Sequence, residues 1–290
     1  MFVATLLVNP RAGRLDPALV TALRDAWGGG TLRWLGPDVA CEFDLPARPE
    51  NAGSVWADFQ SRATDLVIQP GEGRRKRLLI ADMDSTMIEQ ECIDELAAEA
   101  GVGSRVAEIT ARAMNGDLDF EAALKERVGL LRGLDMAVID RVLTKRITLA
   151  PGGPELVSTM RAHGAHAALV SGGFTAFTGS IADKLGCDEH HANTLLIEQG
   201  RLTGEVARPI LGRDAKVAAL EKICARLRIS EGDALAVGDG ANDLGMIDRA
   251  GSGVAMHAKP AVAAQARIRI NHGDLTALLY IQGYSSDDFV

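Results

Sequence analysis

The first seventy residues alternate short apolar runs with amphipathic stretches. Apolar positions two residues apart predict strands, and apolar positions three and four residues apart predict helices. We expect strands over residues 2–8, 31–35, 39–45 and 65–69, and helices over residues 17–27 and 54–62. Asp16 is a candidate N-cap of the first helix, and Gly36-Pro37-Asp38 is a turn signal between the middle strands. The pattern therefore predicts a small α+β unit of βαββαβ order over residues 1–70.

The pattern changes after residue 70. Pro70-Gly71-Glu72-Gly73 and the basic run from Arg74 to Arg77 predict a linker over residues 71–77, which we expect to be solvated. Beyond it, short apolar runs alternate with amphipathic stretches, which is typical of a mostly parallel α/β sheet. The candidate strands of this sheet cover residues 78–81, 166–171, 234–237, 253–255 and 268–270. We therefore expect a second, larger α/β domain over residues 78–290.

Two insertions interrupt this alternation. Residues 87–149 have helical periodicity and no convincing strand. Because this stretch directly follows the first strand of the sheet, we expect it to form a helical cap over the active site. Residues 194–206 alternate apolar and polar positions around Gly200, which predicts a β-hairpin.

The composition is that of an ordinary soluble globular protein, with 290 residues, 47% apolar residues and 24% charged residues. A net charge of −8 argues against a broad nucleic-acid footprint, although a local positive cluster can still bind an anion. No run approaches the ~18 apolar residues of a membrane helix, and residues 1–10 lack the basic start of a signal peptide. The four cysteines are scattered without a CxxC pair, which is typical of reduced thiols. We therefore expect a cytoplasmic protein with a small-molecule substrate, no nucleic-acid partner and no membrane partner.

Carboxylates follow two of the predicted strands. Asp82 and Asp84 come directly after residues 78–81, and Asp239 and Asp243 lie in a GDGxND turn after residues 234–237. The carboxyl ends of parallel strands meet at one edge of the sheet, where ligands bind. Carboxylates gathered there repel one another unless a cation joins them, and oxygen-only ligands favour a hard ion such as Mg²⁺. A DxD pair alone is often just an acidic surface turn, but the two strands together predict a magnesium-dependent phosphoryl-transfer site.

A hydroxyl, two glycines and a lysine add to this site. Ser171 ends a predicted strand, and the backbone N–H of Gly172 beside it can donate to a phosphoryl oxygen. Lys216 can supply a fixed positive charge. Each of these residues alone is typical of an ordinary turn or a solvated surface. Their order along the chain (DxDST, SGG, Lys, GDGxND) is what indicates a site.

This order resembles the haloacid dehalogenase superfamily and, within it, the phosphoserine phosphatases, from Arg77 to the C-terminus. The resemblance implies a Rossmann-like sheet with a helical cap and a β-hairpin flap. It implies that Asp82 attacks phosphorus to form an aspartyl-phosphate, while Asp84 serves as acid and then base. It places Mg²⁺ on the Asp82 carboxylate, the Asp84 backbone carbonyl and the Asp239 carboxylate, with Asp243 acting through the water shell. The residues that it assigns to the phosphoryl group are Ser171, Gly172, Lys216 and Asn242.

The substrate implied by the resemblance is O-phospho-L-serine, hydrolysed to serine and phosphate in the last step of serine biosynthesis. Glu91 matches the family residue that meets the ammonium group, and Arg127 matches the residue that grips the carboxylate. An arginine suits that role because its planar fork binds a carboxylate through two hydrogen bonds. Three alternatives stay open: action on phosphohomoserine, phosphate transfer to another alcohol, and a non-catalytic amino-acid-binding regulator. A cation-pumping ATPase shares the GDGxND turn but needs membrane helices.

The βαββαβ order of residues 1–70 resembles an ACT domain, a module that often binds amino acids at a subunit interface. This resemblance depends on element order and not on motif residues. It implies a homodimer formed through the N-terminal domain, or a degenerate regulatory module. A simple stabilising extension is the open alternative.

Overall fold

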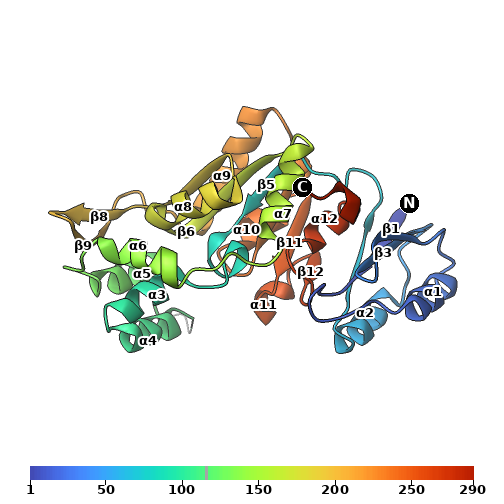
Figure 1. Cartoon of the computed structure of the whole chain (residues 1–290), viewed down its shortest axis with the longest axis horizontal. Coiled ribbons are helices and arrows are strands. Elements are labelled where there is room, and N and C mark those ends of the chain that lie inside the picture. The colour runs from blue at the N-terminus through green and yellow to red at the C-terminus, as the bar shows by residue number, and fades with distance from the viewer. Residues whose placement is uncertain (115–116) are drawn as a thin grey trace.

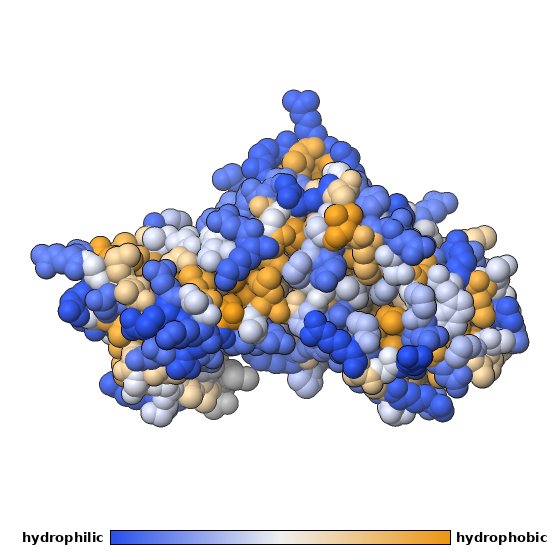
Figure 2. Space-filling view, in the orientation of Figure 1, coloured by the Kyte–Doolittle hydropathy of each residue, from blue (hydrophilic) through white to orange (hydrophobic). Residues whose placement is uncertain are grey.

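The computed structural model describes residues 1–114 and 117–290 of the chain. An N-terminal unit (residues 1–70) lies at one end of the molecule, and a helical insertion with a β-hairpin lies at the other (Figure 1). The larger sheet lies between them. No helix in the described residues is long and apolar enough to cross a membrane. On the face shown in Figure 2, hydrophilic side chains predominate at both ends, and apolar ones gather in the hollowed region between the insertion and the sheet.

The N-terminal unit has the predicted βαββαβ order. Its elements are β1 (Phe2–Leu7), α1 (Pro17–Ala26), β2 (Arg33–Gly36), β3 (Ala40–Leu45), α2 (Ala52–Ser61) and β4 (Asp65–Pro70). Asp16 caps α1, because its carboxylate accepts a hydrogen bond of 2.9 Å from the backbone N–H of Ala18. The strands pair antiparallel in the order β2-β3-β1-β4. This is a split βαβ arrangement, with both helices on one face of the sheet.

The larger sheet is parallel throughout, in the order β12-β11-β10-β5-β6-β7. Its strands are β5 (Leu78–Ala81), β6 (His166–Phe174), β7 (Glu189–Asn193), β10 (Ala234–Gly238), β11 (Ser252–Met256) and β12 (Ile268–Ile270). The expected mostly parallel sheet is therefore confirmed. The sequence pattern missed β7, because an edge strand that begins Glu189-His190-His191 carries no apolar run.

Helices cover both faces of this sheet, because successive residues of a strand point to opposite sides. The helices are α7 (Gly153–Ala162), α8 (Thr175–Leu185), α9 (Arg213–Leu227), α10 (Leu244–Arg249), α11 (Pro260–Ala263) and α12 (Ala277–Tyr280). Leu79 and Ala81 of β5 pack in the core with α7, α8 and α12. Leu78 and Ile80 pack in the core with α9 and α10. The central strand β5 is thus buried on both faces, which fixes the position of the residues at its carboxyl end.

The stretch between β5 and α7 is helical, as expected. It contains α3 (Cys92–Glu99), α4 (Gly103–Met114), α5 (Phe120–Gly129) and α6 (Ala137–Lys145). The expected hairpin is also present as β8 (Leu195–Glu198) and β9 (Arg201–Val206). Backbone hydrogen bonds join the two insertions, from Gly133 to Leu202 at 2.7 Å and from Met136 to Gly200 at 2.9 Å. The hairpin therefore lies against the helical insertion (Figure 1).

The free face of the N-terminal sheet packs on the larger domain. Leu7 and Val67 belong to the same apolar core as α12. Gln69 of β4 donates through Nε2 to the carbonyl oxygen of Ile281 at 2.6 Å. The buried carboxylate of Asp65 accepts hydrogen bonds of 2.8 to 3.0 Å from the three backbone N–H groups of residues 271–273. A carboxylate that satisfies three N–H donors is a strong anchor, because each donor left unpaired costs about 1–3 kcal/mol.

The linker is less solvated than expected. The Arg74 guanidinium lies 2.6 Å from the carboxylate of Glu42, with only 12% of the Arg74 side chain and 2% of the Glu42 side chain exposed. Arg75 lies over the ring of Tyr284, 4.1 Å from its centroid. The expectation of a solvated basic run is therefore wrong for Arg74 but holds for Arg75, whose side chain is 52% exposed. They help to hold the N-terminal unit against the larger domain.

Candidate active site

The loop after β5 begins with Asp82 and Asp84. The backbone N–H of Met83 donates to Asp82 Oδ1 at 2.8 Å, so this carboxylate is held at the end of the strand. The chain then makes an irregular turn over Met83–Met87, in which Asp84 is extended and Ser85 has a left-handed φ of 55°. A non-glycine residue in this region is strained, and such strain is typical of functional loops. We refer to residues 82–87 as the β5 loop.

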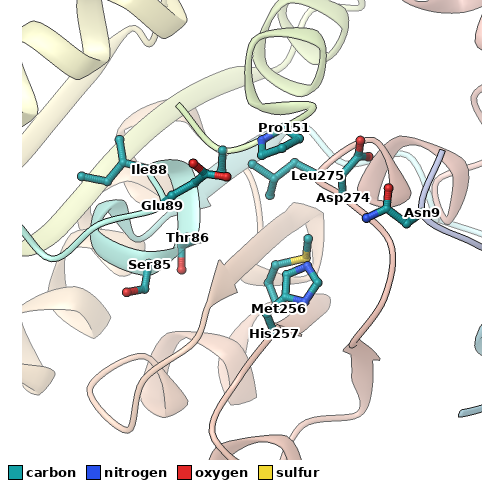
Figure 3. Close-up of a pocket in the computed structure, with 11 residues that line it drawn as sticks. Asn9, Ser85, Thr86, Ile88, Glu89, Pro151, Met256, His257, Asp274 and Leu275 are labelled. Atoms are coloured by element: carbon teal, nitrogen blue, oxygen red, sulfur yellow. The ribbon is translucent and has the colours of Figure 1, made fainter. Parts of the chain in front are cut away.

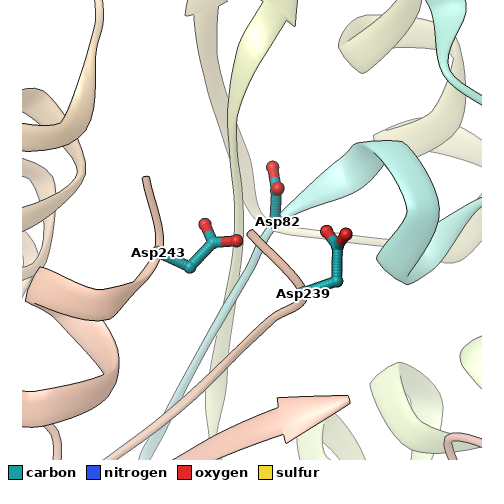
Figure 4. Close-up of side chains that lie close together, drawn as sticks. All are labelled: Asp82, Asp239 and Asp243. Carbon is teal, nitrogen blue, oxygen red and sulfur yellow. The ribbon is translucent and has the colours of Figure 1, made fainter. Parts of the chain in front are cut away.

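The strand pairing brings three carboxylates together. β10 lies next to β5, with Val237 opposite Ala81, so Asp239 emerges beside Asp82. One carboxylate oxygen each from Asp82, Asp239 and Asp243 lies within 4.8 Å of the others, and all three residues are buried (Figure 4). Gly238 allows this approach, since a Cβ there would lie 2.3 Å from the Asp243 carboxyl carbon.

Lys216 joins two of these carboxylates. Its ammonium lies 2.7 Å from Asp82 Oδ1 and 2.6 Å from Asp243 Oδ1, and the side chain is 2% exposed. Burial by itself lowers the pKa of this lysine, but the two carboxylates outweigh it and raise the pKa overall. Burial also raises the pKa of Asp82, as do the negative charges of Asp243 and Asp84, against the opposing effect of Lys216. The single positive charge of Lys216 therefore does not neutralise the three carboxylates of Asp82, Asp239 and Asp243.

Asp84 faces Ser171 across the site. Its Oδ2 accepts a hydrogen bond of 3.1 Å from the Ser171 hydroxyl, and its Oδ1 accepts one of 2.8 Å from the N–H of Cys92. Burial, and then the nearby charge of Glu91, raise the pKa of Asp84 above its usual range. A raised pKa suits a carboxyl group that holds a proton and then gives it to a leaving group.

Gly172 and Asn242 lie next to each other at the same edge. A Cβ on Gly172 would lie 3.8 Å from the Asn242 amide nitrogen and 3.1 Å from the Phe120 ring. A side chain at position 172 would therefore crowd the Phe120 ring of the helical insertion. The structure thus brings together at one edge the expected phosphoryl ligands from β6, α9 and the turn after β10.

Glu91 and Arg127 lie on the helical-insertion side of the site. The carboxylate of Glu91 accepts a hydrogen bond of 2.8 Å from the hydroxyl of Ser85. Arg127 on α5 is half-buried and donates weakly, to the carbonyl of Ala123 at 3.3 Å and the hydroxyl of Thr110 at 3.5 Å. It makes no ion pair within residues 1–114 and 117–290. Burial lowers the pKa of Arg127, although the neighbouring carboxylates of Asp94, then Glu91 and Asp84, oppose that shift.

The donor set fits a hard divalent cation. Carboxylate oxygens from three buried aspartates are ligands that Mg²⁺ accepts. The pKa of Asp239 is raised to about 7, first by burial and then by the charges of Asp243 and Glu91. Both the loss of hydration and the repulsion disfavour the charged carboxylate, and a bound cation would offset both effects.

Three polar residues at the site are not singled out by the sequence pattern. The Ser85 hydroxyl contacts Glu91, and the Thr86 hydroxyl lies 3.5 Å from Asp239 Oδ1. Both immediately follow the DxD pair, so their position in the DxDST segment was the available signal. Asn193 hydrogen-bonds to the backbone of Gly172, and no local signal marks it, because it ends the strand that the apolar pattern missed.

A separate cavity of about 320 Å³ lies against the β5 loop (Figure 3). Ser85 and Thr86 line it, but Ser171, Gly172 and Lys216 do not. Both ring nitrogens of His257 lie at backbone carbonyls, 3.0 Å from Asn271 O and 2.9 Å from Gly273 O. His257 therefore holds the loop after β12.

The same chain segment matches a known family. The model of the haloacid dehalogenase-like hydrolase family matches residues 79–248. The chain is 45% identical over 246 residues to the phosphoserine phosphatase of Archaeoglobus fulgidus, covering 83% of this chain and 71% of that protein. It is 43% identical over 223 residues to the phosphoserine phosphatase of Streptomyces coelicolor, covering 77% of this chain and 54% of that protein. The chain belongs to the phosphoserine phosphatases of the haloacid dehalogenase-like hydrolases.

Solved structures agree with this membership. A haloacid dehalogenase family hydrolase from Salmonella enterica serovar Typhi superposes with a TM-score of 0.86 at 30% identity, covering 97% of this chain and 98% of that one. A phospho-aspartyl intermediate analogue of phosphoserine phosphatase superposes with a TM-score of 0.67 at 42% identity, covering 71% of this chain and 98% of that one. This phosphoserine phosphatase family member is therefore a hydrolase with the α/β fold of its superfamily.

Proposed function

We propose that the chain hydrolyses O-phospho-L-serine to serine and phosphate, the last step of serine biosynthesis, with Mg²⁺ as cofactor. The observation that carries this proposal is the buried cluster at the ends of β5 and β10. There Asp82 lies 2.7 Å from Lys216 and within 4.8 Å of the carboxylates of Asp239 and Asp243. The family supplies the substrate, because the relatives that match over most of this chain are phosphoserine phosphatases.

Asp82 is the nucleophile in this mechanism. Its carboxylate oxygen forms a bond to phosphorus while the bond from phosphorus to the seryl oxygen breaks. Asp84 gives its proton to the departing seryl oxygen, and its raised pKa keeps that proton available. In the second step a water attacks the aspartyl-phosphate, Asp84 takes a proton from that water, and the Asp82 carboxylate is released with inorganic phosphate.

The remaining residues stabilise charge on the transferring group. Ser171, the N–H of Gly172, Lys216 and Asn242 donate hydrogen bonds to its equatorial oxygens. The residues that would hold Mg²⁺ are Asp82, Asp84 through its backbone carbonyl, and Asp239, with Asp243 supporting them from the outer shell. Bound Mg²⁺ neutralises charge on the phosphoryl group and on the carboxylates.

Substrate selection falls to the helical insertion, which acts as a cap with the hairpin as a flap. Glu91 binds the ammonium group of phosphoserine, and Arg127 binds its carboxylate. The weak hydrogen bonds of Arg127 and its lack of an ion pair within the described residues support this role, because its guanidinium is available to an anion. The carboxylate of Glu91 supplies the negative charge that an ammonium group requires.

The expected preference can be measured as phosphate release from L-phosphoserine, L-phosphothreonine, phosphohomoserine and p-nitrophenyl phosphate, with Mg²⁺ and with EDTA. We expect phosphoserine to be the best substrate, activity to disappear in EDTA, and added Mg²⁺ to restore it. Hydrolysis of the aryl ester but not of phosphoserine would support the proposed phosphatase mechanism and reject phosphoserine as the substrate. Transfer of phosphate to an added alcohol would indicate a phosphotransferase, and amino-acid binding without turnover would indicate a regulator.

Arg127→Lys provides the matched specificity control within this assay. Lysine keeps the charge but loses the planar fork, so kcat/KM for phosphoserine should fall by about 10- to 100-fold. Activity on p-nitrophenyl phosphate, which has no carboxylate, should change little. Arg132→Lys, at an exposed position, should leave both activities unchanged. Equal losses on both substrates would show that Arg127 does not read the carboxylate.

We also propose that residues 1–70 are an ACT-like domain through which the chain forms a homodimer, and that the protein works in the cytoplasm. The free sheet face is already covered by α12, so a partner would have to pair with the β2 edge or the helices. Trp34 on β2 is 39% exposed, which supports the edge. Sedimentation of the full chain should give a dimer mass, and Trp34→Lys should shift it to a monomer. A wild-type monomer at tens of micromolar would reject the dimer.

A further inference from the structure

Asn193 connects two segments that carry phosphoryl ligands. It is the last residue of the edge strand β7 and is 2% exposed. Its amide nitrogen donates to the carbonyl oxygen of Gly172 at 2.8 Å and to that of Leu211 at 3.2 Å. Its amide oxygen accepts from the N–H of Leu211 at 2.7 Å. Both N–H donors and the acceptor of this side chain are therefore engaged with backbone.

The hydrogen bond from Asn193 to the Gly172 carbonyl lies where the backbone pairing of β6 with β7 is interrupted. β6 and β7 pair regularly up to Val170, opposite His191, and the pairing resumes only at Phe174, opposite Asn193. Residues 171–173 of β6 are thus left outside the regular ladder. The Asn193 side chain supplies the hydrogen bond that the Gly172 carbonyl would otherwise lack.

This hydrogen bond acts on a peptide group that orients Ser171. The peptide between Gly172 and Gly173 is held at both ends, because its carbonyl accepts from Asn193 and its N–H donates to Ser171 Oγ at 2.8 Å. The same Ser171 hydroxyl donates to Asp84 at 3.1 Å. Asn193 therefore fixes a chain of hydrogen bonds that ends at the acid/base carboxyl group.

The other hydrogen bonds of Asn193 hold Leu211, which lies just before the helix that carries Lys216. Leu211 is held through both its N–H and its carbonyl, and it directly precedes Gly212, the N-cap residue of α9. Lys216 lies on the first turns of this helix, with its ammonium 2.7 Å from Asp82. A shift of the start of α9 would therefore move Lys216 relative to the Ser171 loop.

We propose that Asn193 is a positioning residue that sets the spacing between the β6 phosphoryl ligands and Lys216. The inference rests on the proposed function, since it assigns both groups to the transferring phosphoryl. Misplacement of a catalytic group by about 1 Å can lower a rate by about 10²-fold. Asn193 would act on that spacing without touching substrate.

Asn193→Asp tests the proposal with the smallest change of shape. The carboxylate still accepts from Leu211, but it has no donor for the carbonyls of Gly172 and Leu211 and repels both. We expect kcat for phosphoserine to fall by about 10²-fold, with KM changed less than about threefold because Glu91 and Arg127 are untouched. The affinity of orthovanadate with Mg²⁺, measured by calorimetry, should weaken along with kcat.

Thr194→Ala is the matched control. Thr194 is the next residue, and its hydroxyl makes an exposed contact of 3.3 Å with Thr175 that leads to no phosphoryl ligand. This variant should keep wild-type kcat and orthovanadate affinity. If Asn193→Asp does not fold, Asn193→Ser, which leaves room for water, is measured in the same way. A folded Asn193 variant with kcat and orthovanadate affinity within threefold of wild type would overturn the proposal.

The readouts also separate this inference from the proposed function. Orthovanadate binding needs no turnover of phosphoserine, so it reports on the phosphoryl ligands even if the substrate assignment is wrong. Wild-type protein that binds orthovanadate but does not hydrolyse phosphoserine would reject the substrate alone. A loss of unfolding stability in Asn193→Asp with unchanged orthovanadate affinity would reduce Asn193 to a structural residue and overturn the inference.

Discussion

Asp82→Asn is expected to lower kcat by on the order of 10⁴-fold or more, which is the scale seen when a nucleophile is removed. An amide nitrogen or oxygen in place of the carboxylate cannot form the aspartyl-phosphate, so the reaction loses its two-step route. The expected result is measured as phosphate release from phosphoserine over hours. Substrate binding should survive, because Glu91, Arg127 and Lys216 remain in place.

The same variant should fold at least as well as the wild type at neutral pH. Burial and neighbouring carboxylates raise the pKa of Asp82, which means that the folded state disfavours its charged form. A raised carboxyl pKa reduces stability at pH values above it, so a neutral asparagine removes this penalty. Asp248→Asn, exposed on α10, is the control and should leave both turnover and unfolding unchanged. Retention of more than a few per cent of activity by Asp82→Asn would mean that another residue is the nucleophile.

The position of the acidic cluster could be predicted from sequence because it depends on a local rule. Apolar runs such as residues 78–81 are buried on both faces, so parallel pairing is the expected state, and their carboxyl ends must coincide. The location of Asp82 and Asp239 at this edge then follows from their place directly after the two strands. Their approach to Asp243 depends on Gly238, which the GDGxND turn also shows.

Other parts of the site required tertiary information. β7 is a polar edge strand, so apolar periodicity could not find it, and Asn193 at its end was missed with it. Glu91 is the N-cap residue of α3 and Arg127 lies on α5, in charged stretches that look solvated in sequence, and only family resemblance singled them out. The docking of Asp65 on residues 271–273 joins groups more than 200 residues apart, which no local pattern contains.

Lys216→Met should have the second largest effect, on stability as well as on rate. Methionine retains much of the length of the side chain but leaves the carboxylates of Asp82 and Asp243 without their common partner, 2.7 and 2.6 Å from the lost ammonium. Breaking a buried ion pair from one side costs roughly 3–5 kcal/mol, because a charge is left buried and unpaired. We expect a loss of this size in urea unfolding in EDTA, and a loss in kcat/KM of about 10³-fold with Mg²⁺.

Added Mg²⁺ should restore part of the stability of Lys216→Met but little of its activity. A cation bound by Asp82 and Asp239 relieves repulsion among the carboxylates, whereas it cannot replace a hydrogen-bond donor to the phosphoryl oxygens. Lys222→Met, at an exposed position on the same helix, should behave as wild type in both measurements. If Lys216→Met were as stable as wild type in EDTA, the carboxylates would have to be protonated in the folded protein. Asp82 would then need to lose a proton before it could attack, and the rate would rise with pH through that pKa.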